Sequence, residues 1–153
     1  MATQLELMRL QLKFSVPGTP CGKGRPRFFG GHAVTPAKTR NYEALVKYEA
    51  QHALDTMVVK PDYSQPCRVG IKAFFGVPKS YTKKQRALIS EYGSSRVRPG
   101  KPDIDNIIKA ILDGMNAIIY RDDVQVTELR ASKLWACDDE QPRVEVCVEW
   151  DDD

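Results

Sequence analysis

Apolar and polar residues alternate strictly in three stretches of the chain. Residues 8–16, 68–77 and 143–150 carry an apolar side chain at every second position. Successive side chains of a strand point to opposite faces of the sheet, so each stretch predicts a half-buried β-strand. Residues 124–135 predict a fourth strand, in which the alternation shifts at 128–129 and indicates a bulge.

Helical spacing of apolar residues predicts three helices between these strands. The first spans residues 38–57, and its inner face is expected to hold Tyr42, Leu45, Val46, Ala53, Leu54 and Met57. The second spans 83–92, with Thr82 and Gln85 spaced as a capping box and Gly93 at the C-terminal cap. The third runs over four turns, with an apolar face made of Ile104, Ile107, Ile108, Ile111, Leu112, Met115 and Ile118.

The order of these elements predicts an α/β (α+β) fold. We expect a single small domain over residues 1–153, with a mixed four-stranded sheet packed on helices. No stretch approaches the roughly 20 apolar residues of a membrane span, and the polar N-terminus is unlike a signal peptide. The chain is therefore expected in the cytoplasm, without a membrane partner. Four scattered cysteines and two histidines argue against a zinc site.

A net charge of +3 hides an uneven distribution of charge along the chain. Residues 1–101 carry 18 lysines and arginines against 6 aspartates and glutamates, whereas residues 102–153 carry 5 against 14. This division indicates a basic surface for a polyanion beside an acidic cluster that another group must neutralise. The alternative is that the charges simply pair across the fold.

The segment PGTPCGKGRPRFFGGHAVTP, residues 17–36, predicts an irregular, hairpin-like excursion. Lys23, Arg25 and Arg27 occupy every second position, so they share a side if the chain is extended. Phe28 and Phe29 follow them. This aromatic pair either packs in a loop or core, or wedges against an opened base step of a nucleic acid.

Carboxylates stand at both ends of the third predicted helix. Asp103 is placed to cap its N-terminus. Capping leaves Asp105 unexplained, and Asp105 shares one helix side with Lys109, Asp113 and Asn116. The simple interpretation of that side is a row of ion pairs, in which Lys109 would pair with Asp105 or Asp113.

A divalent cation accounts for the same carboxylates together with their basic neighbours. Arg96, Arg98 and Lys101 lead directly into the acidic segment. Carboxylates beside a polyanion-binding surface would repel the ligand unless they hold a cation, and Mg²⁺ prefers such oxygen ligands. The D-x-D motifs of phosphatases and glycosyltransferases usually end an apolar strand, which is absent here, so these interpretations lose weight. A calcium loop is excluded because its later ligands and the glycine at its sixth position are missing.

The string KPDIDNIIKAILDGMNAIIYRDDVQV, followed by Lys133, resembles the RusA family of Holliday junction resolvases (crossover junction endodeoxyribonucleases). PGTPCGKGRPR and TPAKTRNYE are also similar to segments of that family, and the resemblance runs from about Phe14 to Lys133. It implies that Asp103, Asp105 and Asp123 are catalytic metal ligands and that Lys109 is the essential lysine. Asp122 is the neighbour that an alignment shifted by one residue would substitute.

The resemblance implies a small homodimer, of a kind often carried by phages and prophages, that cuts four-way DNA junctions with Mg²⁺, or with Mn²⁺ as a substitute. Hydrolysis of the phosphodiester would leave a 5′-phosphate, and Lys109 would stabilise charge on the scissile phosphate. The candidate DNA-contacting residues are Lys23, Arg25, Arg27, Arg96, Arg98, Lys101 and Lys133. Two alternatives remain open: another metal-dependent nuclease acting on nicks or flaps, and a non-catalytic DNA-binding protein.

The position of Asp123 raises a question of reach. A helix rises about 1.5 Å per residue, so Asp103 and the predicted helix end at Ile118 lie roughly 22 Å apart. Asp123 reaches Asp103 of its own chain only if residues 119–123 run back along the helix. Otherwise a two-fold dimer brings Asp123 to the partner's site. We expect that dimer to bury the apolar face of the helix.

Overall fold

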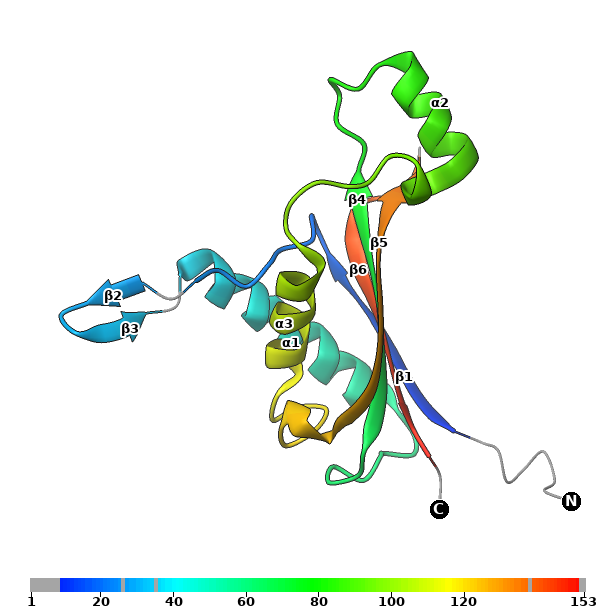
Figure 1. Cartoon of the computed structure of the whole chain (residues 1–153). Helices are drawn as coiled ribbons and strands as arrows, with labels where there is room; N and C mark the ends of the chain where they lie inside the picture. The colour runs from blue at the N-terminus through cyan, green and yellow to red at the C-terminus, as the bar shows by residue number, and fades with distance from the viewer. Residues whose placement is uncertain (1–8, 26, 35, 138, 152–153) are drawn as a thin grey trace, which may run out of the picture.

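Four strands form a mixed sheet at the centre of the fold. The computed structural model describes residues 9–25, 27–34, 36–137 and 139–151, except for the side chains of Arg27 and Val34. The strands are β1 (Leu10–Pro17), β4 (Cys67–Gly76), β5 (Val126–Ala136) and β6 (Arg143–Trp150). They lie in the order β1-β6-β4-β5; β4 and β5 run parallel, and the other two pairs are antiparallel. The predicted mixed four-stranded sheet is confirmed (Figure 1).

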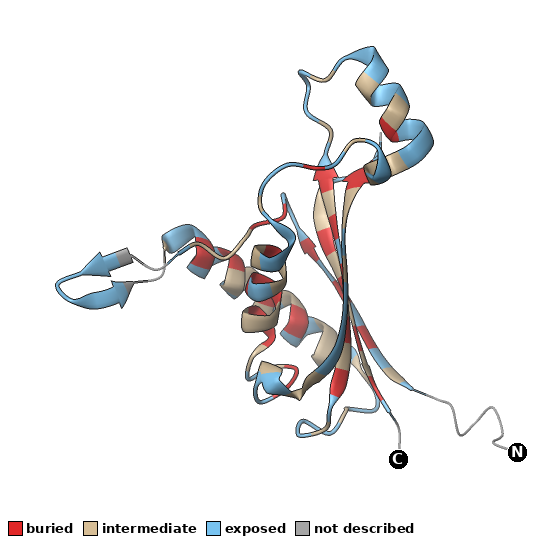
Figure 2. Ribbon diagram, viewed as in Figure 1, coloured by how far each residue is buried: buried red, intermediate tan, exposed pale blue. Residues whose placement is uncertain are grey.

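The alternation of apolar residues places the core on one face of this sheet. On β1, Leu12, Phe14 and Val16 are buried, whereas Lys13 and Ser15 are exposed. Two helices, α1 (Ala37–Thr56) and α3 (Ile104–Met115), lie over the apolar face (Figure 1). Buried positions accordingly gather between the helices and the sheet (Figure 2).

The two helices over the sheet pack closely against each other. A Cβ atom at Gly114 would lie 2.6 Å from the Cβ of Val46, so glycine is needed for this approach of α3 to α1. Ile107, Ile111 and Met115 are fully or almost fully buried inside the chain. A dimer is therefore not needed to cover this part of the apolar face, which α1 and the sheet already bury, whereas Ile104 of the same face is 39% exposed.

The remaining predictions for the first two helices are confirmed. Tyr42 and Val46 of the expected inner face of α1 are buried, and the other members pack against the core as partly buried residues: Leu45, Ala53, Leu54 and Met57. Helix α2 (Lys83–Tyr92) begins with the capping box, in which Gln85 N donates to Thr82 Oγ1 and Thr82 N donates to Gln85 Oε1. It ends at Gly93 and is followed by the short 3-10 helix η2 (Gly93–Ser95).

Two predicted boundaries are wrong by a few residues. Helix α3 ends at Met115 and not at Ile118, because the carbonyl of Met115 accepts the N–H groups of both Ile118 and Ile119 in a tight turn. The bulge of β5 precedes the predicted position at 128–129. Cys67 pairs with Val126 and Arg68 pairs with Glu128, which leaves Thr127 as the extra residue.

A second, two-stranded sheet stands apart from the main one. Strands β2 (Arg27–Phe29) and β3 (His32–Val34) form the hairpin within the predicted excursion. The hairpin lies beyond the N-terminal end of α1, away from the four-stranded sheet (Figure 1). Across the described residues, no helix is both long enough and apolar enough to span a bilayer.

Candidate active site

Asp103 stands at the N-terminal end of α3, after a cis peptide bond between Lys101 and Pro102. Its backbone carbonyl accepts the N–H groups of Asn106 and Ile107, but its carboxylate caps none of the helix N–H groups. That carboxylate instead accepts a hydrogen bond of 2.8 Å from Lys101 Nζ. The hydrogen bond and charge of Lys101, with a smaller contribution from Lys133, lower the pKa of Asp103. The capping interpretation of this side chain is wrong.

Asp105 and Lys109 follow on the exposed side of α3. Their separation of four residues places them one turn apart on the same helix side. Among the ion pairs of the described residues, none joins Lys109 to Asp105 or Asp113. The ion-pair interpretation of Lys109 is therefore wrong.

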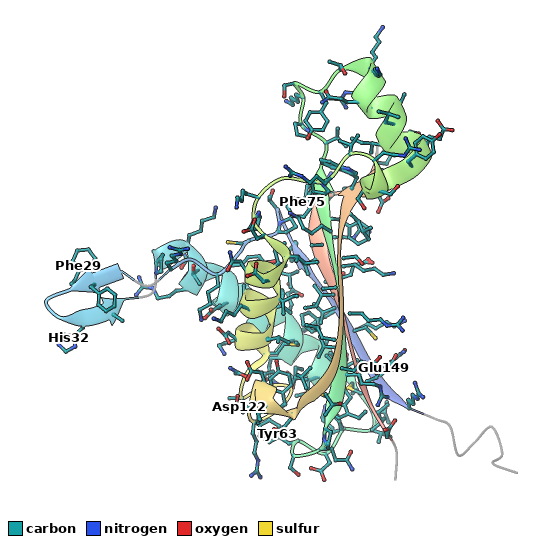
Figure 3. All side chains as sticks on the ribbon, viewed as in Figure 1. Phe29, His32, Tyr63, Phe75, Asp122 and Glu149 are labelled. Carbon is teal, nitrogen blue, oxygen red and sulfur yellow. The ribbon has the colours of Figure 1, made fainter. Side chains whose placement is uncertain are left out.

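A basic cavity of about 620 Å³ opens at this end of α3. Its lining includes Arg98, Lys101, Asp103 and Lys133. Lys133 reaches it from β5; its amine donates to the carbonyl of Gly100 and lies 5.3 Å from the centre of the Phe75 ring. Figure 3 shows Phe75 near the end of the sheet that faces the start of α3.

The pKa of Lys133 is lowered by its surroundings in the cavity. Partial burial of the amine is the main cause; the nearby charges of Arg98 and Lys101 act in the same direction, and Asp103 opposes them. An anionic ligand in the cavity would relieve this repulsion between the cations. The site is thus electrostatically suited to a phosphate group.

Lys23 connects the basic excursion to α3 instead of pointing freely to solvent. Its amine lies 2.5 Å from Asp113 Oδ2 and 3.1 Å from Glu43 Oε1. The hydrogen bond with Asp113 is the largest cause of the raised pKa of Lys23; burial opposes it, and Glu43 adds to it. Sequence reasoning missed Glu43, because only the packing of α1 against α3 brings it to Lys23.

Close backbone contacts hold the same excursion against the start of α3. Lys23 N donates to Asn106 O at 3.0 Å, and a Cβ atom at Gly22 would lie 2.7 Å from the Cβ of Pro102. Arg25 is exposed beside this contact, in a second hollow of about 710 Å³ that Lys101 also lines. The side chain of Arg27 lies outside the described residues. The basic surface therefore extends from the cavity of Lys133 to the root of the hairpin.

Arg96 contacts an aromatic side chain at the end of α2. Its guanidinium carbon sits 4.6 Å from the centre of the Tyr92 ring, at the end of α2. Arg98 lines the cavity of Asp103, whereas Arg96 is absent from that lining. Of the two arginines before Lys101, only Arg98 lies directly at the candidate site.

Asp122 and Asp123 lie at the other end of α3. Asp122 caps the short 3-10 helix η3 (Asp123–Gln125), which begins at Asp123. Tyr120 fixes this segment near α3, because its hydroxyl donates to the carbonyl of Leu112 at 2.8 Å. A hydrogen bond with Asp122, partial burial, and the charges of Asp122 and Asp113 raise the pKa of Asp123. The charge of Asp113, in the last turn of α3, thus acts on Asp123.

The structure does not bring the three predicted metal ligands together in one chain. Helix α3 has 12 residues, so its ends lie about 18 Å apart. Asp103 and Asp105 stand at one end, while the turn after Met115 keeps Asp123 at the other, next to Asp122 (Figure 3). Within the described ranges, no three Asp, Glu, His or Cys side chains are grouped to hold a metal ion.

Comparison with known proteins identifies the family of the chain. The model of the family described as endodeoxyribonuclease RusA matches residues 17–149, which include both ends of α3 and the basic excursion. The chain is also 36% identical over 143 residues to the uncharacterized protein YqaN of Bacillus subtilis (strain 168), an alignment that covers 90% of this chain and 94% of that protein. The fold, the two carboxylate-bearing ends of α3 and the family match lead to one conclusion: the chain belongs to the RusA family of endodeoxyribonucleases.

Proposed function

We propose that this protein is a Mg²⁺-dependent, structure-specific endodeoxyribonuclease that resolves four-way (Holliday) DNA junctions by paired symmetric nicks. The observation that carries the proposal is the cavity at the start of α3. It combines the carboxylate of Asp103 with the cations of Lys101 and Lys133. Cations suit a DNA phosphate, while carboxylates suit a metal ion, so the cavity offers partners to both.

The metal ligands are proposed to come from two chains. Asp103, Asp105 and Asp123 supply the oxygen atoms that Mg²⁺ prefers, but one chain holds them at opposite ends of α3. A two-fold axis beside α3 would place the start of one α3 against the end of its partner's. Asp123 of one protomer would then join Asp103 and Asp105 of the other, and the dimer would contain two complete sites.

Two exposed aliphatic side chains support this dimer. Ile104 lies between the two aspartates at the start of α3 and is 39% exposed, and Val124 follows Asp123 and is 79% exposed. The proposed pairing would cover both residues, which a single chain leaves in water. Apolar contact between Ile104 of one protomer and Val124 of its partner would hold Asp123 at a fixed distance from the partner's Asp103 and Asp105. Two sites related by a two-fold axis also suit two symmetric cuts in a four-way junction.

Each residue of the site has a proposed role. The three aspartates would hold the ion, and a bound Mg²⁺ or Mn²⁺ supplies Lewis-acid chemistry for phosphodiester hydrolysis. Lys109, next to Asp105, would stabilise charge that develops on the scissile phosphate. Arg98, Lys101 and Lys133 would hold the neighbouring phosphates, which gives salt-sensitive binding with little sequence preference.

An assay of cleavage against DNA shape tests the proposal. Four-way junctions, flaps, nicked duplexes and plain duplexes of matched sequence are incubated with the protein and Mg²⁺. We expect paired symmetric cuts in the four-way junction, no comparable cleavage of the other substrates, and no cleavage in EDTA.

The Asp105→Asn variant gives the matched control. It should lose cleavage by at least about a thousandfold while it retains junction binding, since the variant lowers negative charge beside DNA. Flap or duplex cleavage at the same rate as junction cleavage would replace the resolvase proposal with a more general nuclease. If wild type binds junctions but cleaves none of the substrates in Mg²⁺ or Mn²⁺, the protein is a non-catalytic DNA-binding protein and the nuclease proposal is wrong.

A further inference from the structure

The β2–β3 hairpin has a defined tip. Phe28 pairs with Ala33 and Phe29 pairs with His32, so two residues, Gly30 and Gly31, form the turn. Both glycines have positive φ, +56° and +83°. A two-residue turn with positive φ at both positions matches the twist of the strands and favours glycine. The tip therefore has a definite geometry and presents Phe29 and His32 directly beside the turn (Figure 3).

Two large aromatic side chains are exposed on this hairpin. Phe28 is 76% exposed and Phe29 is 66% exposed. Adjacent residues of a strand point to opposite faces, so the two rings lie on the two faces of the hairpin. The hairpin projects away from the body of the protein, and its described residues are exposed (Figure 2). Neither ring thus contributes to the core.

The chain around the hairpin is basic. Between residues 7 and 42 the sequence contains no aspartate or glutamate, and its cations are Arg9, Lys13, Lys23, Arg25, Arg27, Lys38 and Arg40. Arg25 and Lys38 are exposed and line the hollow at the root of the hairpin, together with Lys101. Exposed cations followed by exposed aromatic rings suit a nucleic acid, in which phosphates meet the cations and bases stack on the rings.

The root of the hairpin is attached to the candidate active site. Gly24 N donates to Thr39 Oγ1 at 2.9 Å at the start of α1, and Lys23 N donates to Asn106 O in the first turn of α3. The same first turn carries Asp105. DNA that lies with a phosphate at Asp103 and Asp105 would therefore continue over Lys101 and Arg25 towards the aromatic tip.

We propose that the β2–β3 hairpin is a wedge that inserts Phe28 and Phe29 among the unstacked bases at the centre of branched DNA. This inference rests on the proposed function and assigns it a structure-recognising element. A fully stacked duplex offers its bases only at its ends, whereas a branch point offers bases whose stacking is already weakened. The hairpin would thus favour branched DNA over duplex DNA, while the cations alone would bind both.

The test uses the full-length Phe28→Ala/Phe29→Ala double variant and a four-way junction with 2-aminopurine at the branch point. With wild-type protein in Ca²⁺, we expect binding to change the 2-aminopurine fluorescence. The double variant should lose this change, bind the junction at least about tenfold more weakly and bind duplex within about twofold of wild type. A Phe28→Trp/Phe29→Trp variant should retain junction binding, since tryptophan also stacks.

Tyr48→Ala is the matched control, because Tyr48 is 67% exposed on α1, away from the hairpin. It should behave as wild type. Unchanged melting temperatures establish that all variants fold. If wild type cleaves junctions and the double variant matches it in affinity, cleavage and fluorescence, the wedge is excluded and the proposed function stands.

Two further outcomes also count against the wedge. Dissociation of the double variant into monomers by sedimentation would make the hairpin a subunit contact and overturn the inference. Absence of junction binding and cleavage by wild type would overturn the proposed function, and the wedge with it.

Discussion

The two ends of α3 carry aspartates in opposite electrostatic surroundings. At the start of the helix, Lys101 lowers the pKa of Asp103 through a hydrogen bond and through its charge. At the other end, Asp122 raises the pKa of Asp123, with the charge of Asp113 acting in the same direction. The first end has cations beside its carboxylates and can receive a phosphate. At the second end two neighbouring carboxylates, Asp122 and Asp123, interact directly, and a bound cation would offset their repulsion.

This difference gives a physical reason for joining the two ends. A protomer keeps its cation-rich end and its carboxylate-rich end about 18 Å apart along one helix. Two protomers in a two-fold pair would bring unlike ends together at two places. The carboxylates of Asp122 and Asp123 would then lie close to the cations of the partner's cavity and to a shared metal ion.

The largest expected effect is a loss of cleavage when Lys109, the lysine beside Asp105, is replaced. Lys109→Met should reduce junction cleavage by about a hundredfold, because a cation that stabilises transition-state charge is typically worth that much. Junction affinity should change by less than about threefold. Lys72→Met, on the exposed face of β4, is the matched control and should cleave normally. Equal rates for both variants in single-turnover assays would remove Lys109 from the catalytic role.

The next effect concerns the contact that holds the basic excursion to α3. Lys23→Met keeps most of the side-chain volume but leaves Asp113 and Glu43 facing each other without a cation. We expect a loss of about 1–3 kcal/mol in the free energy of unfolding, measured by urea denaturation. Arg25→Met removes a neighbouring exposed cation and should leave stability unchanged, while it weakens DNA binding and its salt dependence.

A result in which Arg25→Met destabilises the protein and Lys23→Met does not would contradict this division of roles. The comparison is informative because both residues belong to one basic run. Lys23 is partly buried in an ion-pair network, whereas Arg25 is exposed at the hollow that Lys101 shares. The two residues look equivalent in the sequence, and only the structure shows that their surroundings differ.

The smallest expected effect is a shift in melting temperature, which should have opposite signs when Asp103 and Asp123, at the two ends of α3, are replaced. The folded state binds the proton of Asp123 more tightly than the unfolded state does, since the pKa of Asp123 is raised. Its contribution to stability is therefore lost as pH rises through that raised pKa, and Asp123→Asn should raise the melting temperature slightly at pH 7. The lowered pKa of Asp103 has the opposite consequence. Its contribution is present at pH 7 and lost on acidification through the lowered pKa, so Asp103→Asn should lower the melting temperature.

Calorimetry of the two variants at pH 7 without a divalent metal measures this difference. At a pH below the pKa of both carboxyl groups, the two variants should approach the melting temperature of wild type. Shifts of the same sign at pH 7 would contradict the electrostatic contrast between the two ends of α3.

The sequence alone predicts the elements of the fold well, because their signals are local. Strict alternation identifies β1, β4 and β6, and the spacing of Thr82 and Gln85 identifies the start of α2. The errors occur at element ends and bulges, whose positions are set by tertiary contacts. The turn at Met115 shortens α3, and the register of β4 against β5 moves the bulge to Thr127.

The candidate site could be predicted only in part. The D-x-D spacing and the basic residues before it predict one half of the candidate site at the start of α3. The pairing of Lys23 with Glu43 and Asp113 joins residues on three separate segments, which no spacing in the sequence records. Whether Asp123 serves its own chain or its partner depends on the turn after α3, and five residues of sequence do not fix the direction of a turn.

Subunit complementation tests the central claim, that Asp123 completes the site of the partner protomer. Asp105→Asn and Asp123→Asn chains are each expected to be inactive as homodimers. In a mixed dimer, one site would contain both substitutions and the other would contain none. Co-refolded chains in equal amounts should therefore recover about a quarter of the wild-type sites and nick a four-way junction on one strand at a time. Absence of cleavage from dimers shown to be mixed, by differently tagged chains, would contradict the claim, because sites contained within single chains leave every site with a substitution.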